Sequence, residues 1–130
     1  MTAVSGSVTP QWLRLREPAD ALARSERLVE SLRERLADCG HLDIHDLGSG
    51  SGSMGRWLAP RLPASQRWVL RDRDETLLEV AAAHPPRAPA GHRVTVEAVS
   101  GDLTRLTPPD LAGATLVTAY ALLDILTADE

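Results

Sequence analysis

At 130 residues, the chain has room for one domain with a single hydrophobic core. Its formal net charge of -4 and its sequence pI near 5.5 argue against a general nucleic-acid-binding surface, which would normally be basic. The basic residues are all arginines, which excludes Schiff-base chemistry on a lysine, and the one cysteine, Cys39, cannot form an internal disulfide. Because the sequence has neither an apolar run long enough to span a membrane nor a leader-like start, it predicts a cytoplasmic protein.

The N-terminal part of the chain is predicted to be an arm followed by a helix. Residues 1–17 are expected to form a partly disordered arm, because the first ten are small, polar and aperiodic. From Pro18 to about Asp38, apolar residues recur at the spacing of one buried helical stripe, and mixed charges cover the remaining faces. Residues 18–130 are therefore expected to form one domain.

The rest of the sequence alternates between strand and helix patterns. In chain order we expect a strand over 42–47, a helix over 53–61, a strand over 67–71, a helix capped by Asp74, a proline-rich loop over 84–91, a half-exposed strand near a sheet edge over 93–99, a loop extended by Pro108 and Pro109, a strand over 114–119 and a helix beginning at 122–126. This alternation predicts an α/β fold: a Rossmann-like, mainly parallel sheet of about four strands with flanking helices and right-handed crossovers.

The stretch over 44–55 reads Ile-His-Asp-Leu-Gly-Ser-Gly-Ser-Gly-Ser-Met-Gly. An acid and alternating glycines after a strand are typical of a chain that turns sharply, brings its backbone close to a ligand and starts a helix. A flexible Gly/Ser linker is the alternative, but a linker is not usually bounded by a strand and an amphipathic helix. We therefore expect a nucleotide-type loop.

Acids follow three successive predicted strands. Asp46, Asp72 and Asp102 each lie at or just past a strand end, where parallel sheets bind their ligands. Asp72 lies twenty positions after Gly52, near the spacing at which a carboxylate accepts hydrogen bonds from ribose hydroxyls. The alternatives are a solvated loop acid at Asp72 and, at Asp102, an Asx turn that stabilises its own loop.

The glycine loop is compatible with two ligands. Gly50, Gly52 and Gly55 match the dinucleotide fingerprint G-x-G-x-x-G, which alone is weak evidence. A carboxylate at Asp46 would repel a pyrophosphate but would suit a ligand with cationic groups. S-adenosylmethionine is such a ligand, since it carries a sulfonium, an ammonium, a ribose and an adenine but no phosphate.

These motifs resemble those of the class I S-adenosylmethionine-dependent methyltransferases. Residues 44–52 are similar to that family's first motif, residues 70–81 to its ribose-binding strand end and helix, residues 100–103 to its adenine-binding turn, and residues 115–123 to its fourth strand. The resemblance covers about residues 40–126. It implies S-adenosyl-L-methionine as the methyl donor and S-adenosyl-L-homocysteine as the product.

The resemblance also implies a set of cofactor-binding residues: Arg24, Asp46, Gly48, Ser49, Gly50, Gly52, Asp72, Arg73, Asp102, Leu103 and Ala119. The loop backbone would contact the methionine part and Asp46 would favour its ammonium. Asp72, next to Arg73, would hold the ribose, and Asp102 and Leu103 the adenine. Ala119 would face the reacting end and Arg24 would pair with the methionine carboxylate, although a solvated helix-face arginine is the alternative for Arg24.

The chain departs from the family in having fewer predicted strands. Because the sequence stops at what resembles the start of a helix, we expect a fragment of a longer protein. The fourth strand would otherwise be an apolar edge that favours a homo-oligomer.

The sequence leaves the acceptor and any catalytic residue unassigned. It favours a small-molecule acceptor over RNA because the chain is acidic, and it predicts no membrane association. An NAD-binding oxidoreductase half-domain and a non-catalytic cofactor-binding module remain as alternatives. His41 and His45 flank Asp43, but neighbouring strand residues point to opposite faces and no further ligand is near, so no metal site is expected.

Overall fold

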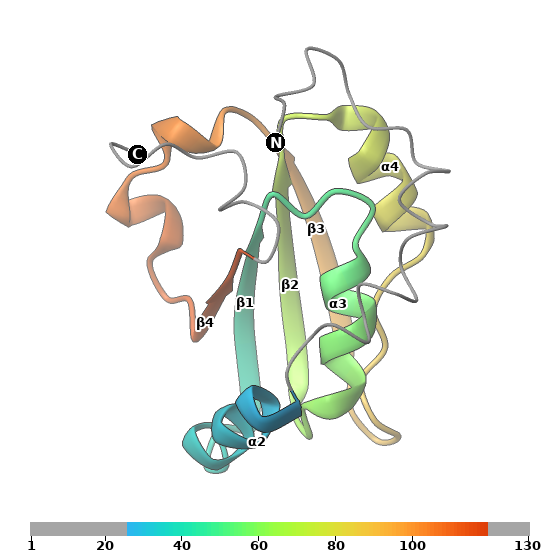
Figure 1. Cartoon of the computed structure of the whole chain (residues 1–130), viewed down its shortest axis with the longest axis vertical. Helices are drawn as coiled ribbons and strands as arrows, with labels where there is room; N and C mark the ends of the chain where they lie inside the picture. Colours follow the sequence, from blue (N-terminus) through green and yellow to red (C-terminus); the bar gives the residue numbers. More distant parts are fainter. Residues whose placement is uncertain (1–25, 120–130) are drawn as a thin grey trace.

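Residues 26–119 are described by a computed structural model, and within them four strands form one parallel sheet in the order β3-β2-β1-β4 (Figure 1). The strands are β1 (His41–Leu47), β2 (Ser65–Asp72), β3 (Val94–Ser100) and β4 (Leu116–Thr118). The helices are α2 (Glu26–Arg35), α3 (Ser53–Leu58) and α4 (Glu75–Ala83), with 3-10 turns η1 (Ala59–Arg61), η2 (Leu103–Arg105) and η3 (Pro108–Leu111). The predicted Rossmann-like α/β fold is thereby confirmed.

The direction in which strands are added reverses at β1. The chain adds β2 beside β1 and β3 beside β2, and then returns to place β4 on the other side of β1. In open parallel sheets, ligands bind at such a reversal, beyond the carboxyl ends of the strands. The carboxyl ends of β1 and β4 therefore mark where a site is expected.

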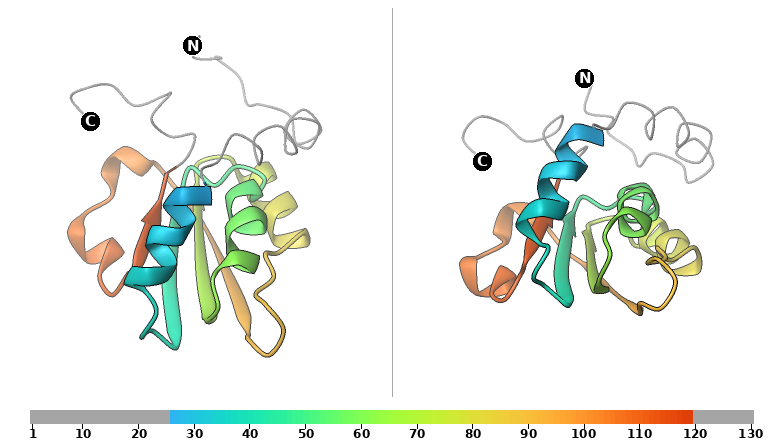
Figure 2. Two further views of the ribbon diagram at one scale, coloured as in Figure 1. Left: turned by 60° about the horizontal axis from the view of Figure 1, so that its bottom comes forward. Right: turned by 90° about the horizontal axis from the view of Figure 1, so that it is seen from below.

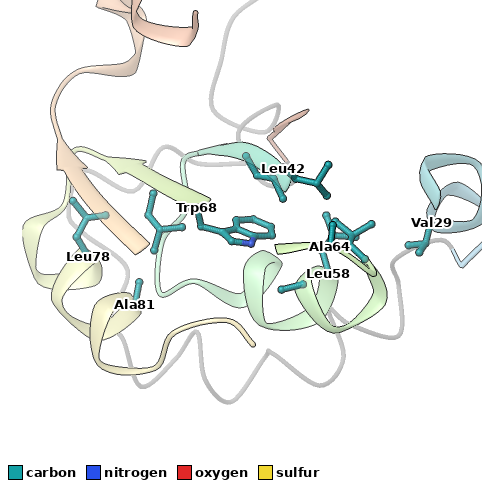
Figure 3. Packing of buried hydrophobic residues seen from close by; sticks show 11 residues of the cluster. Val29, Leu42, Leu58, Ala64, Trp68, Leu78 and Ala81 are labelled. Carbon is teal, nitrogen blue, oxygen red and sulfur yellow. The ribbon is translucent and has the colours of Figure 1, made fainter. Parts of the chain in front are cut away.

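One face of the sheet carries the core. Figure 2 shows α2, α3 and α4 on one side of the sheet, and the η2–η3 segment beside β4. Every second residue of the strands points to the helices, and Leu42, Ile44, Trp68 and Leu70 are at most 1% exposed. Figure 3 shows Trp68 at the centre of this cluster, which includes Val29 from α2.

A buried glutamine ties β2 to the turn that precedes it. The Gln66 amide nitrogen donates to the carbonyl oxygens of Ala59, Leu62 and Ala64, at 3.0, 2.9 and 3.3 Å. Its amide oxygen accepts a 2.8 Å bond from the indole nitrogen of Trp68. Gln66 is 1% exposed, so these bonds satisfy polar groups that water does not reach.

Some predicted boundaries were wrong. The helix expected over 53–61 ends at Leu58 and continues as η1, because Pro60 has no N–H to continue the α-helical bonds. The loop at Pro108 is the 3-10 turn η3, and the fourth strand is shorter than 114–119. The arm over 1–17 and the helix start at 122–126 lie outside the described residues.

Two other predictions, one for a strand and one for a helix, agree with the structure. Strand β3 lies at one edge of the described sheet, as predicted, and the Asp74 side chain caps α4 by accepting a 3.1 Å bond from the Leu77 amide.

Within residues 26–119, each helix is too short or too polar to cross a lipid bilayer.

Candidate functional site

The glycine loop connects the carboxyl end of β1 to the start of α3. Gly48, Gly50 and Gly52 have φ angles of 70°, 55° and 92°, all in the left-handed region. Residues with a Cβ seldom adopt these angles, so the alternation of glycines is what lets the chain turn here. The predicted strand, turn and helix succession is confirmed.

The amides of this loop are used inside the protein. The N–H groups of Gly48 and Ser49 both donate to the Arg71 carbonyl, at 2.8 and 3.1 Å. Gly52 donates to the Ser49 carbonyl at 3.0 Å, and Gly50 donates to the Asp72 carboxylate at 2.8 Å. A phosphate-binding loop offers such N–H groups to its ligand instead.

Asp72 lies at the end of β2 and holds the loop. Its Oδ2 accepts from Gly50, and its Oδ1 accepts a 2.9 Å bond from the Asp74 amide. A carboxylate has about four acceptor positions, so these two bonds leave it capacity for a vicinal diol. The sequence predicted a ligand-binding acid at Asp72 but not its bond to the loop.

Asp46 lies inside the last part of β1 and is 2% exposed. Its Oδ1 accepts a 2.7 Å hydrogen bond from the Thr118 hydroxyl, and Thr118 is 8% exposed. The two residues are partners in the β1–β4 register. The acid is therefore buried at the reversal of strand order and is not an open group at the loop mouth.

Sequence reasoning missed Thr118. Its only signal is a polar residue at the end of an otherwise apolar strand pattern, and the pairing of β4 with β1 is a long-range contact that the pattern does not specify.

Ser49 has a buried hydroxyl inside the loop. The residue is 7% exposed, and within the described part of the chain its Oγ has no hydrogen-bond partner. Buried hydroxyls are normally bonded, so an unsatisfied one at a strand end fits a group that meets a ligand.

Asp102 follows β3 and caps η2. Its Oδ1 accepts from the Thr104 hydroxyl at 2.7 Å and from the Thr104 amide at 2.9 Å, which is the self-stabilising turn considered from the sequence. These two bonds, the hydroxyl bond first, hold the pKa of the exposed Asp102 carboxyl below its ordinary value. Leu103 is the first residue of η2 and is partly buried.

The three acids are carried by neighbouring strands, since β3, β2 and β1 are adjacent in the sheet. Of the remaining predicted residues, Arg73 is exposed after β2 and Ala119 is partly buried just after β4. Arg24 lies outside the described residues.

His41, Asp43 and His45 share one face of β1, because every second strand residue points the same way. The alternation argument against a metal site was therefore wrong for these three. His41 Nε2 lies 3.4 Å from Asp43 Oδ1, but His45 Nδ1 accepts a 3.2 Å bond from Arg71. Among residues 26–119, no three His, Cys, Asp or Glu side chains are grouped so as to hold a metal ion.

No protein-family model matches this chain, and a search of curated proteins finds no significant match. Its function must therefore be inferred from the site itself.

Proposed function

We propose that the chain binds S-adenosyl-L-methionine at the carboxyl ends of β1, β2 and β3 and serves methyl transfer. The observation that carries this proposal is the chemistry of the glycine loop. Four of its amides are already bonded within the protein, and a carboxylate is buried two residues before its first glycine. Such a loop suits a ligand with cationic groups and hydroxyls better than one with phosphates.

In this proposal, different residues contact different parts of the ligand. The Asp46 carboxylate favours the ammonium group by charge, and the Ser49 hydroxyl and the surfaces of Gly48, Gly50 and Gly52 contact the methionine part. Asp72 accepts from the ribose hydroxyls with the capacity that its two internal bonds leave. Asp102 and Leu103 meet the adenine, and Ala119 borders the reacting end.

The bound donor supplies a methyl group on a sulfonium, whose neutral thioether is a good leaving group. The task of the protein is then mainly to orient the acceptor, with little need for acid–base help. Charge favours a small-molecule acceptor over RNA, because the chain carries -4 at neutral pH.

An NAD-binding half-domain is the second candidate, and Gly55 favours it. A Cβ at Gly55 would lie 3.4 Å from Pro86 and 3.5 Å from the Trp68 ring. These are ordinary van der Waals distances, so Gly55 has the place of the third glycine of the dinucleotide fingerprint, between helix and sheet, but the packing there does not require a glycine. The occupied loop amides and the buried Asp46 weigh against it, since a pyrophosphate would need those amides and would be repelled by that charge.

Calorimetry on the chain tests the proposal. We expect S-adenosylmethionine and S-adenosylhomocysteine to bind and NAD not to bind. Tight NAD binding without S-adenosylmethionine binding would overturn the proposal. Cofactor binding without methylation of any offered acceptor would instead indicate a non-catalytic binding module.

The variant Asp72→Ala tests the role of this carboxylate in binding the ribose. We expect it to weaken S-adenosylmethionine binding by ~1.5–3 kcal/mol, the size of a hydrogen-bond loss to a charged group. The amide of Gly50 should also exchange faster with deuterium, because it loses its acceptor. Unchanged affinity would remove Asp72 from the site.

A further inference from the structure

The hydrogen bond between Asp46 and Thr118 joins the two strands that border the reversal of strand order. It is 2.7 Å long, both residues are buried, and they are partners in the register. Strand β4 pairs with β1 over only three residues, of which Thr118 is the last. The bond therefore couples the end of a short strand to the acid that precedes the glycine loop.

A buried carboxylate depends strongly on such a donor. A hydroxyl donating to Oδ1 stabilises the charged form and restricts the side-chain torsions of the aspartate. Thr118 thus restricts the direction of the Asp46 carboxylate and contributes one donor to its charged form.

We propose that Thr118 is a positioning residue that orients the charged Asp46 toward the amino-acid end of the ligand. This inference rests on the proposed function, because it assumes a ligand with an ammonium group near Asp46. Thr118 belongs to β4, whereas the glycine loop follows β1 and the acids Asp72 and Asp102 follow β2 and β3. The inference therefore adds a fourth strand to the site.

The test compares three ligands by calorimetry: S-adenosylmethionine, S-adenosylhomocysteine and 5′-methylthioadenosine, which has the nucleoside but no amino-acid part. Thr118→Val keeps the shape of the side chain and removes the hydroxyl. We expect it to weaken the first two ligands about ten-fold, the effect of losing one charge-assisted hydrogen bond, and to leave 5′-methylthioadenosine within about two-fold. Thr118→Ser should restore wild-type affinity because it keeps the hydroxyl.

Thr115→Val is the matched control just before β4. Thr115 is exposed, and its hydroxyl accepts a 3.1 Å bond from the Asp43 amide, away from Asp46. We expect this variant to bind all three ligands like the wild type. If Thr118→Val does not fold, Thr118→Ala and Thr118→Ser are compared instead.

Asp46→Asn completes the design. It should weaken the binding of the same two ligands. Adding Thr118→Val to it should weaken their binding little further, because both changes act on the same contact, that of the Asp46 carboxylate with the ammonium group. Equal weakening of all three ligands by Thr118→Val would mean a structural role and would overturn the inference, as would wild-type affinity for all three. Neither result would affect the proposed function, which fails only if the wild-type chain does not bind S-adenosylmethionine.

Discussion

Gly52 is required by its backbone angle and also by its neighbours. Its φ is 92°, and a Cβ there would lie 3.0 Å from Arg56 Nη1 and 3.1 Å from the Ala81 Cβ. The arginine end could shift, but Ala81 belongs to α4 and is 1% exposed, so it has little room to move. The glycine therefore sets how closely the loop approaches α4.

We predict that Gly52→Ala destabilises the protein by about 1–2 kcal/mol for the left-handed backbone and by a further ~1–3 kcal/mol for overpacking. Gly91→Ala is the control, because Gly91 has a φ of 91° and nothing within 4 Å of its added Cβ. It should show only the backbone cost. Urea unfolding of both variants measures the difference, and equal losses would mean that contact with Ala81 is unimportant.

At the scale of the elements, Gln66 connects β2 to the turn that precedes it. The side chain satisfies three carbonyl groups around η1 and the Trp68 indole, all on the covered face of the sheet. This explains why a polar residue lies in a buried strand. The carbonyl groups of Ala59 and Leu62 also accept backbone bonds from Leu62 and Ala64, at 3.2 and 2.9 Å, so Gln66 adds to the bonds of this turn.

We predict that Gln66→Leu lowers the free energy of unfolding by ~3 kcal/mol, because the Trp68 indole and the Ala64 carbonyl lose their bond to Gln66 in a place that water does not reach. Arg67→Gln, on the next residue, should cost at most about 1 kcal/mol. Arg67 points to the other face, where it pairs with Glu97 at 2.7 Å and Asp43 at 3.7 Å while remaining 43% exposed. Denaturant unfolding monitored by tryptophan fluorescence compares the two, and a mild effect of Gln66→Leu would contradict the argument.

Local signals in the sequence were sufficient to predict most of the elements. The residue type of Asp74 indicates the N-cap of α4, and the alternating glycines indicate the turn after β1. Pro60 correctly indicates the end of the α-helix, but the bonds between Gln66 and the 3-10 turn η1, which contains Pro60, are not specified by the helix pattern.

The site was predictable only in part, for a related reason. Strand ends place Asp46, Asp72 and Asp102 near one edge of a parallel sheet, so their grouping follows from topology. What each carboxylate bonds to is set by register and by loop geometry. The Thr118 bond to Asp46 and the Gly50 bond to Asp72 join residues far apart in sequence, and no periodicity specifies them.

At the scale of the whole molecule, a second network lies on the opposite face of the sheet. Arg71 donates through Nε to His45 Nδ1 at 3.2 Å and through Nη2 to the Asp110 carbonyl at 3.0 Å. It thereby connects β1, β2 and the η3 turn of the β3–β4 connection. His45 is 4% exposed and must be neutral to accept this bond.

Burial, followed by the charges of Arg71 and Arg67, lowers the pKa of His45 from its ordinary value of 6.5, while Asp43 and Glu97 oppose this shift. The unfolded chain therefore binds the proton more readily than the folded chain. The stability that neutral His45 contributes is fully present above pH 6.5 and diminishes as the pH falls below that value. It is lost once the pH is below the folded-state pKa.

We predict that the free energy of unfolding of the wild type falls between pH 7 and pH 5 more steeply than that of His45→Gln, which has no imidazole to titrate. Arg71→Gln should reduce the slope without removing it, because the burial of His45 remains when one of the opposing charges is lost. Urea unfolding at a series of pH values gives the three slopes. If His45→Gln has the wild-type slope, the pH dependence arises elsewhere, whereas an Arg71→Gln slope equal to that of His45→Gln would make charge, and not burial, the cause.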